Sequence, residues 1–199
     1  MSGKLSNKTA LVTGGSRGIG RAIALAFAKE GAALIGVHYG SNADAAEATI
    51  REIEALGAKG VAIKADLSKG KEAADSLWDQ FKTAAIAATG EPGLDILVNN
   101  AGIAQAVSLA ETSESFFDET MTINFKAPFF LIQAAADHIR DNGRIINIST
   151  GFTRIAAPNQ GSRALSVPNP ATPAAISAAS DKAQTATTAA TCSRLRPCR

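Results

Sequence analysis

Short apolar runs alternate with helix-like segments along residues 9–148, and this alternation constrains the fold more than any other feature of the chain. The apolar runs, each expected to be a β-strand, are 9–13, 33–37, 61–65, 94–98 and 143–148. The helical segments between them are 18–30, 42–56, 71–88 and 115–140. Because each run is continuously apolar, the strands are expected to be buried on both faces.

The predicted fold is therefore an α/β domain with a doubly wound, Rossmann-type parallel sheet of about five strands in the order 3-2-1-4-5. A ligand of such a sheet binds at the carboxyl ends of the strands, near the switch between strands one and four. Locally, we expect Asn42 to cap its helix and Pro128 to kink the long last helix. In the helix at 71–88, Leu77, Phe81 and Ile86 are expected to point inward.

A glycine-rich turn at 13–20, TGGSRGIG, joins the first strand to the first helix. Glycines let the backbone approach a pyrophosphate closely, and a helix N-terminus supplies free N–H groups and a positive dipole. The spacing is a variant of the dinucleotide fingerprint. We predict that this turn holds the pyrophosphate of a dinucleotide; the alternative is a tight turn without a ligand. The predicted binding residues here are Gly14, Gly15, Ser16, Arg17, Gly18, Ile19 and Gly20.

The end of the second strand favours NADP(H) over NAD(H). An NAD enzyme usually places a carboxylate there for the ribose 2′-hydroxyl, but the first carboxylate after this strand is Asp44. Arg17 would supply a fixed charge for a 2′-phosphate. His38 and Tyr39 are predicted to lie at the adenine end. The alternatives are a solvated arginine and a capped strand end.

Further motifs follow in order: ADL at 65–67, NNAG at 99–102, TINFKAPF at 122–129 and GRIINIST at 143–150. Together with the glycine turn they resemble the short-chain dehydrogenase/reductase family, especially its 3-oxoacyl-(acyl-carrier-protein) reductases, over about residues 5–160. The resemblance implies an NADP-dependent oxidoreductase that reduces a carbonyl or oxidises an alcohol of a small-molecule substrate. It implies cofactor contacts by Asp66, Leu67, Asn100, Ala101 and Gly102. Asp66 has the alternative of capping the next segment, and Asn99 is expected to tie the fourth strand to its neighbours.

The family's catalytic asparagine, serine, tyrosine and lysine are only partly matched. The resemblance places Asn124 in the asparagine role, with a locally satisfied helix asparagine as the alternative, and Thr150 in the serine role. The tyrosine and lysine positions hold Arg163 and Val167, and no YxxxK occurs in the sequence. Since the tyrosine is the family's proton donor, we expect impaired turnover. The alternatives are a non-catalytic NADP-binding pseudoenzyme and a frameshifted fragment.

Residues 161–199 are rich in Ala, Ser, Thr and Pro and contain no aromatic residue. We therefore divide the chain into a dinucleotide-binding domain at 1–160 and a low-complexity tail at 161–199 that is expected to be disordered. A reading-frame shift near codon 161 or a natural extension would explain the change. The fold is expected to be truncated relative to the family, with a bare edge on strand five. Relatives form homodimers or tetramers, and the interface is in doubt here.

Charge and composition bear on four further possibilities: nucleic-acid binding, membrane insertion, secretion and metal binding. The net charge of +2 comes with scattered basic residues, which argues against nucleic acid as a partner. No apolar run is long enough to span a membrane, and the N-terminus lacks a secretory apolar region. Cys192 and Cys198 have no metal-site spacing. We expect a cytoplasmic protein without a metal.

Overall fold

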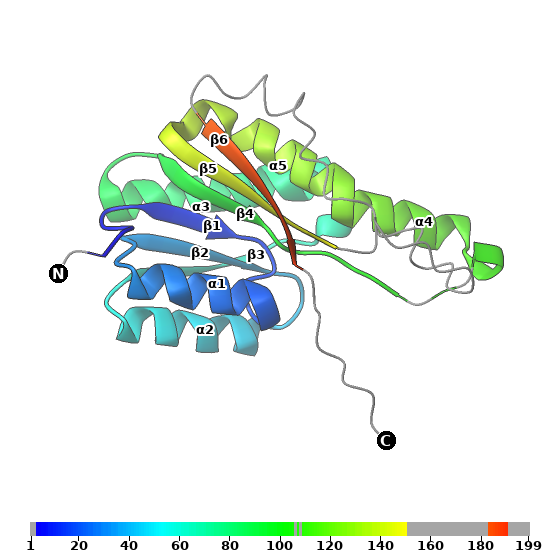
Figure 1. The fold of residues 1–199 in the computed structure, drawn as a ribbon, viewed down its shortest axis with the longest axis horizontal. Helices are drawn as coiled ribbons and strands as arrows, with labels where there is room; N and C mark the ends of the chain where they lie inside the picture. Colours follow the sequence, from blue (N-terminus) through cyan, green and yellow to red (C-terminus); the bar gives the residue numbers. More distant parts are fainter. Residues whose placement is uncertain (1–2, 106, 108, 151–182, 191–199) are drawn as a thin grey trace.

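The computed structural model describes residues 3–105, 107, 109–150 and 183–190. A single sheet carries helices on both faces (Figure 1). Its strands are β1 (Thr9–Val12), β2 (Leu34–Tyr39), β3 (Lys59–Lys64), β4 (Leu94–Asn99), β5 (Ile139–Thr150) and β6 (Ala183–Ala190). The helices are α1 (Gly18–Lys29), α2 (Ala43–Ala55), α3 (Lys71–Thr89), α4 (Glu114–Met121) and α5 (Ala127–Ala135). Shorter turns of helix are η1 (Leu67–Lys69), η2 (Leu109–Glu111), η3 (Thr122–Lys126) and η4 (Ala136–His138).

All neighbouring strands are parallel, in the order β3-β2-β1-β4-β5-β6. The predicted fold class and the order of the first five strands are confirmed. Helices α1 and α2 lie on one face, and α3 and α5 lie on the other (Figure 1). Strand β1 shows why both faces need cover: Leu11 packs into the core beneath α3 and α5, while Ala10 and Val12 pack into the core beneath α1. All three are fully buried, so each face of the strand contributes to a core.

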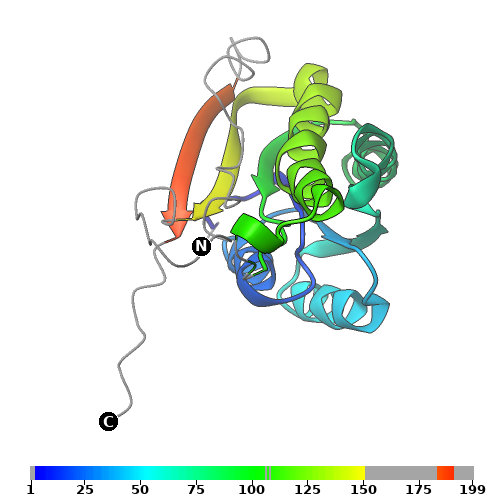
Figure 2. The same cartoon turned by 90° about the vertical axis from the view of Figure 1, so that its right-hand side faces the viewer.

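Strand β6 is the main departure from the sequence-based expectation. It pairs in parallel with β5 from Gly143 to Thr150 and lies at the end of the sheet (Figure 2). A bare edge on β5 was therefore the wrong expectation, because residues 183–190 satisfy the backbone groups of that edge. The rest of the tail, 161–182 and 191–199, lies outside the described residues.

The segment predicted as one helix over 115–140 is divided. Helix α4 passes through the π-helical turn η3 into α5, and Pro128 is the second residue of α5, directly after that turn. The helical region ends with η4 at His138, so the predicted helix end at residue 140 is wrong. Arg140 belongs to β5 instead, and its side chain bonds to acidic groups near the start of β4.

Two local predictions have opposite outcomes. The Asn42 cap is confirmed, because its Oδ1 accepts the Ala45 N–H at 3.0 Å. The inward position of Ile86 is wrong: its side chain is 46% exposed, whereas Ala85 is fully buried. The fourth residue after the buried Phe81 returns to the same face of α3, while the fifth is rotated about 100° further.

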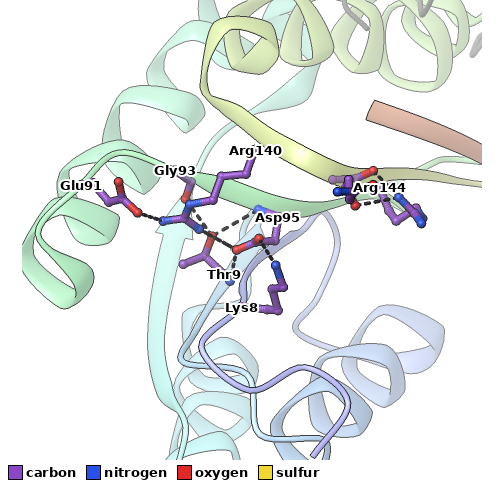
Figure 3. Close-up of polar contacts among 9 residues, drawn as sticks. Lys8, Thr9, Glu91, Gly93, Asp95, Arg140 and Arg144 are labelled. Carbon is purple, nitrogen blue, oxygen red and sulfur yellow. Dashed lines mark hydrogen bonds and ion pairs between the residues drawn. The ribbon is translucent and has the colours of Figure 1, made fainter. Parts of the chain in front are cut away.

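A network of charged side chains lies at the amino ends of the strands, opposite the glycine turn (Figure 3). The carboxylate of Asp95, only 4% exposed, lies between Lys8 Nζ at 2.8 Å and Arg140 Nη1 at 2.6 Å. Its Oδ2 also accepts the backbone N–H of Thr9 at 2.9 Å. Arg140 continues to Glu91 at 2.7 Å. The network joins the starts of β1, β4 and β5, so it aligns the strands whose far ends form the candidate site.

Candidate functional site

A groove of about 580 Å³ lies at the carboxyl ends of β1, β2, β3 and β4. Most of the predicted cofactor residues line it: Gly14, Ser16, Arg17, Gly18, Ile19, His38, Tyr39, Asp66, Leu67, Asn100, Ala101 and Gly102. Residues that are far apart in the sequence meet here because parallel strands end at the same edge of a sheet.

Gly15 and Gly20 do not line the groove but shape its wall. A Cβ on Gly20 would collide with the carbonyl of Gly14, so glycine lets α1 begin against the turn. Gly14 and Gly18 have φ angles of +62° and +55°, which favour glycine. The turn is thus built from backbone, and no acidic residue stands in the first turn of α1. Its N-terminal N–H groups and positive dipole suit an anion.

Thr13 and Asn100 hold the glycine turn against the end of β4. Thr13 Oγ1 accepts the N–H groups of Asn100 and Ala101 at 2.9 and 3.0 Å. In return, Asn100 Nδ2 donates to the carbonyls of Thr13 at 2.9 Å and Gly14 at 3.2 Å. The amide nitrogen of Asn100 therefore positions the turn. Asn99 bonds to Asn147 at 2.9 Å, which confirms that it ties β4 to a neighbouring strand.

His38 is a buried part of the groove wall. It is only 3% exposed, its Nδ1 lies 3.1 Å from Gly14 N, and its Nε2 lies 3.0 Å from Ala65 O. Burial lowers the pKa of His38, with the hydrogen bond to Ala65 opposing that shift. The imidazole therefore connects the ends of β2 and β3 to the glycine turn.

Asp66 caps η1: its Oδ1 accepts from Ser68 Oγ at 2.7 Å and from Ser68 N at 3.1 Å. These hydrogen bonds lower the pKa of Asp66, so it is ionised at neutral pH. The capping alternative is confirmed, and Asp66 also lines the groove. Arg17 and Asp66 are the charged members of this lining among the described residues, and Arg17 is exposed.

Asn124 lies in η3 and pairs with the loop after β4. Its Oδ1 accepts the Ile103 N–H at 2.9 Å, and its Nδ2 donates to the Ile103 carbonyl at 2.8 Å. This satisfaction comes from a tertiary contact rather than from the local helix backbone. Thr150 is the last residue of β5, and its side chain lies outside the described residues, as do Arg163 and Val167.

Some lining residues were not predicted from the sequence: Gly40, Ser41, Asn42, Ala65, Ile103 and Ile123. The first three directly follow Tyr39, so continuing past the end of the second strand would have found them. Ile103 and Ile123 carried no signal, because their approach to the groove depends on the π-helical turn and the Asn124 contact.

No group of three or more potential metal ligands is found in the part of the chain that the structure describes. Within the same residues, no helix is long and apolar enough to cross a membrane.

Comparison with known proteins identifies the family. Residues 8–162 match the family model for short chain dehydrogenases. The chain belongs to the short-chain dehydrogenase family. This member is 38% identical over 155 residues to an uncharacterized oxidoreductase of Methylorubrum extorquens, covering 78% of this chain and 59% of that protein. The family is one of oxidoreductases.

Solved structures agree with the family assignment. The landomycin C-6 ketoreductase LanV, crystallised with NADP and rabelomycin, is 44% identical with a TM-score of 0.78, covering 82% of this chain and 66% of LanV. A short chain dehydrogenase from Burkholderia cenocepacia in complex with NADP is 39% identical with a TM-score of 0.73, covering 81% and 63%. The chain therefore spans less than two thirds of the length of each of these relatives.

Proposed function

We propose that the groove binds NADP(H) and that the chain is an NADP-dependent oxidoreductase for a small carbonyl or alcohol substrate. The observation that carries this proposal is the backbone cradle formed by the glycine turn and the N-terminus of α1. A Cβ at Gly20 would collide with the carbonyl of Gly14, so glycine there lets α1 begin against the turn, and no acidic residue in the first turn of α1 repels an anion. These residues fit a pyrophosphate.

The preference for the phosphorylated dinucleotide is supported by charge. Arg17 lies exposed at the groove, and residues 38–42, at the end of β2, contain no carboxylate. A guanidinium pairs favourably with a phosphate, whereas an NAD site uses a carboxylate for the ribose hydroxyls. The NADP in the crystals of LanV and the Burkholderia protein agrees with this choice.

We also propose that this chain turns over its substrate slowly. NADP(H), when bound, supplies or accepts a hydride. Thr150 would orient the substrate carbonyl through its hydroxyl, and Asn124 holds the Ile103 loop beside the groove. The family positions of the proton donor and its lysine hold Arg163 and Val167. Loss of a positioned general acid lowers a rate by about 10²–10⁴-fold.

Calorimetric titration of the purified 199-residue chain with NADPH and NADH tests the binding proposal. We expect tighter binding of NADPH, and tighter binding of NADH would refute the cofactor preference. Assays with NADPH and a 3-oxoacyl thioester or simple ketone test turnover. Binding without turnover would select the pseudoenzyme alternative, while neither binding nor cooperative unfolding would select a defective fragment. If no single-base shift in the coding DNA restores YxxxK, the frameshift explanation fails.

We also propose self-association through the long helical segment and a cytoplasmic location. Phe117 and Phe125 are 44% and 36% exposed on this segment, and such side chains favour a protein interface. Ile132 lies on the same helical segment but is buried in the core. Size-exclusion chromatography with light scattering tests the association, and imaging of a tagged chain tests the location.

A further inference from the structure

His38 contacts each segment that forms one end of the groove. Its side chain reaches Gly14 in the glycine turn and Ala65 at the end of β3, while its own carbonyl accepts the Gly15 N–H at 2.9 Å. The ring is 3% exposed, so these contacts form with little competition from water. One side chain thus joins the turn to two strand ends.

The two ring contacts determine the tautomer. The Gly14 N–H is a donor, so Nδ1 must accept and carry no proton. The Ala65 carbonyl is an acceptor, so Nε2 must carry the proton and donate. The neutral Nε2–H form satisfies both contacts, and no other form of the ring does.

The Gly14 contact controls the shape of the cradle. Gly14 has a left-handed backbone, and its carbonyl already accepts from Asn100 Nδ2. With the N–H held by His38 and the carbonyl held by Asn100, the peptide groups on both sides of Gly14 are fixed. A turn that is fixed before binding does not need to be ordered when a ligand arrives.

We propose that His38 is a positioning residue for dinucleotide binding, acting through its Nδ1 bond to Gly14 rather than through contact with the ligand. This inference rests on the proposed function, because the groove must hold a dinucleotide for the positioning to matter. From the sequence, His38 is expected at the adenine end of the cofactor, with a capped strand end as the alternative. The geometry instead places the ring of His38 between the glycine turn and the end of β3, where it contacts both.

Two substitutions separate the ring contacts. His38→Asn places an amide oxygen near the position of Nδ1, so it retains an acceptor for Gly14. His38→Gln extends its amide toward the position of Nε2, so it retains a donor for Ala65 and loses the Gly14 acceptor. Both variants are polar and neutral, which makes them matched controls for burial and charge.

The test measures the dissociation constant of NADPH by calorimetry for the wild type and both variants, at a temperature where circular dichroism shows all three folded. We expect His38→Gln to weaken binding about 5- to 10-fold, as for one neutral hydrogen bond, and His38→Asn to stay within about 2-fold. Wild-type affinity in His38→Gln, or equal weakening in both variants, would overturn the inference about His38 and leave the proposed function standing. If the wild type itself binds no NADPH, the proposed function fails and the inference fails with it.

A second measurement does not depend on binding or on the folding of the variants. The ¹⁵N chemical shifts of the wild-type imidazole at pH 7 should show an unprotonated Nδ1 and a protonated Nε2. The opposite tautomer would overturn the inference, because Nδ1 could not then accept from Gly14.

Discussion

Replacing Asp95 with asparagine keeps the shape of the side chain but removes the charge at the centre of the network in Figure 3. The carboxylate accepts from Lys8, from Arg140 and from the buried backbone N–H of Thr9. An asparagine turns one of its oxygens into an NH₂ group that faces these donors. The substitution therefore leaves at least one donor without an acceptor in a buried position.

The expected loss in the free energy of unfolding follows from how deeply the charged side chains of the network are buried. Removing one partner of a buried ion pair costs about 3–5 kcal/mol. The side chains of Arg140 and Lys8 are 25% and 45% exposed, so both keep part of their hydration. We therefore expect the lower end, a loss of about 3 kcal/mol in the free energy of unfolding. For a chain of this size, that loss corresponds to a fall in Tm of about 6–12 °C.

Urea unfolding followed by fluorescence measures this loss, because Trp78 is the only tryptophan and is 4% exposed in the folded state. Asp75→Asn is the matched control: Asp75 pairs with Lys71 at 2.6 Å on the surface of α3, with both side chains about half exposed. We expect the control to cost less than about 0.5 kcal/mol. A loss below about 1 kcal/mol for Asp95→Asn, or equal losses in both variants, would refute the reasoning.

The effect of Asp95→Asn on stability should also depend on pH. Burial acts to raise the pKa of Asp95, but the hydrogen bonds from Lys8 and Thr9 and the charge of Arg140 outweigh burial and lower it. A carboxyl whose pKa is lower in the folded state stabilises the fold above its unfolded pKa, and this contribution is lost as the pH falls through the folded pKa. The stability difference between wild type and Asp95→Asn should therefore shrink as the pH falls below about 4. A difference that stays constant on acidification would contradict this account.

Three further predictions concern the sheet and the groove. Gly36→Ala would place a Cβ 2.7 Å from Phe81 Cδ2, so we expect a loss of about 1–3 kcal/mol in urea unfolding, whereas Gly40→Ala, with open space around it, should change stability little. Arg17→Ala should weaken NADPH binding about 10-fold in calorimetry and leave NADH binding unchanged; equal weakening of both would contradict the 2′-phosphate role. Because burial lowers the pKa of His38, the free energy of unfolding should fall as the pH drops below about 6.5, and His38→Asn should flatten that dependence.

The local pattern of the sequence was sufficient for the fold class and for the order of the first five strands, but not for β6. Continuous apolar runs, glycine stops and the Asn42 cap act over a few residues, and the handedness of the crossovers then leaves few ways to order the strands. The position of the groove followed for the same reason, since parallel strands end at one edge of the sheet. The glycine turn was recognisable because its backbone geometry requires particular residues at particular places.

Only the tertiary structure decided which distant groups meet. Arg140 was assigned to a helix by its neighbours in sequence, yet it belongs to β5 because Asp95, which is distant in the sequence, supplies its partner. His38 was a strand-end residue by position, and its role emerged only when Gly14 and Ala65 were found on either side of its ring. Periodicity and turn chemistry are properties of neighbouring residues and can be read from the chain. The pairing of a buried polar group depends on contacts across the fold, which no local pattern encodes.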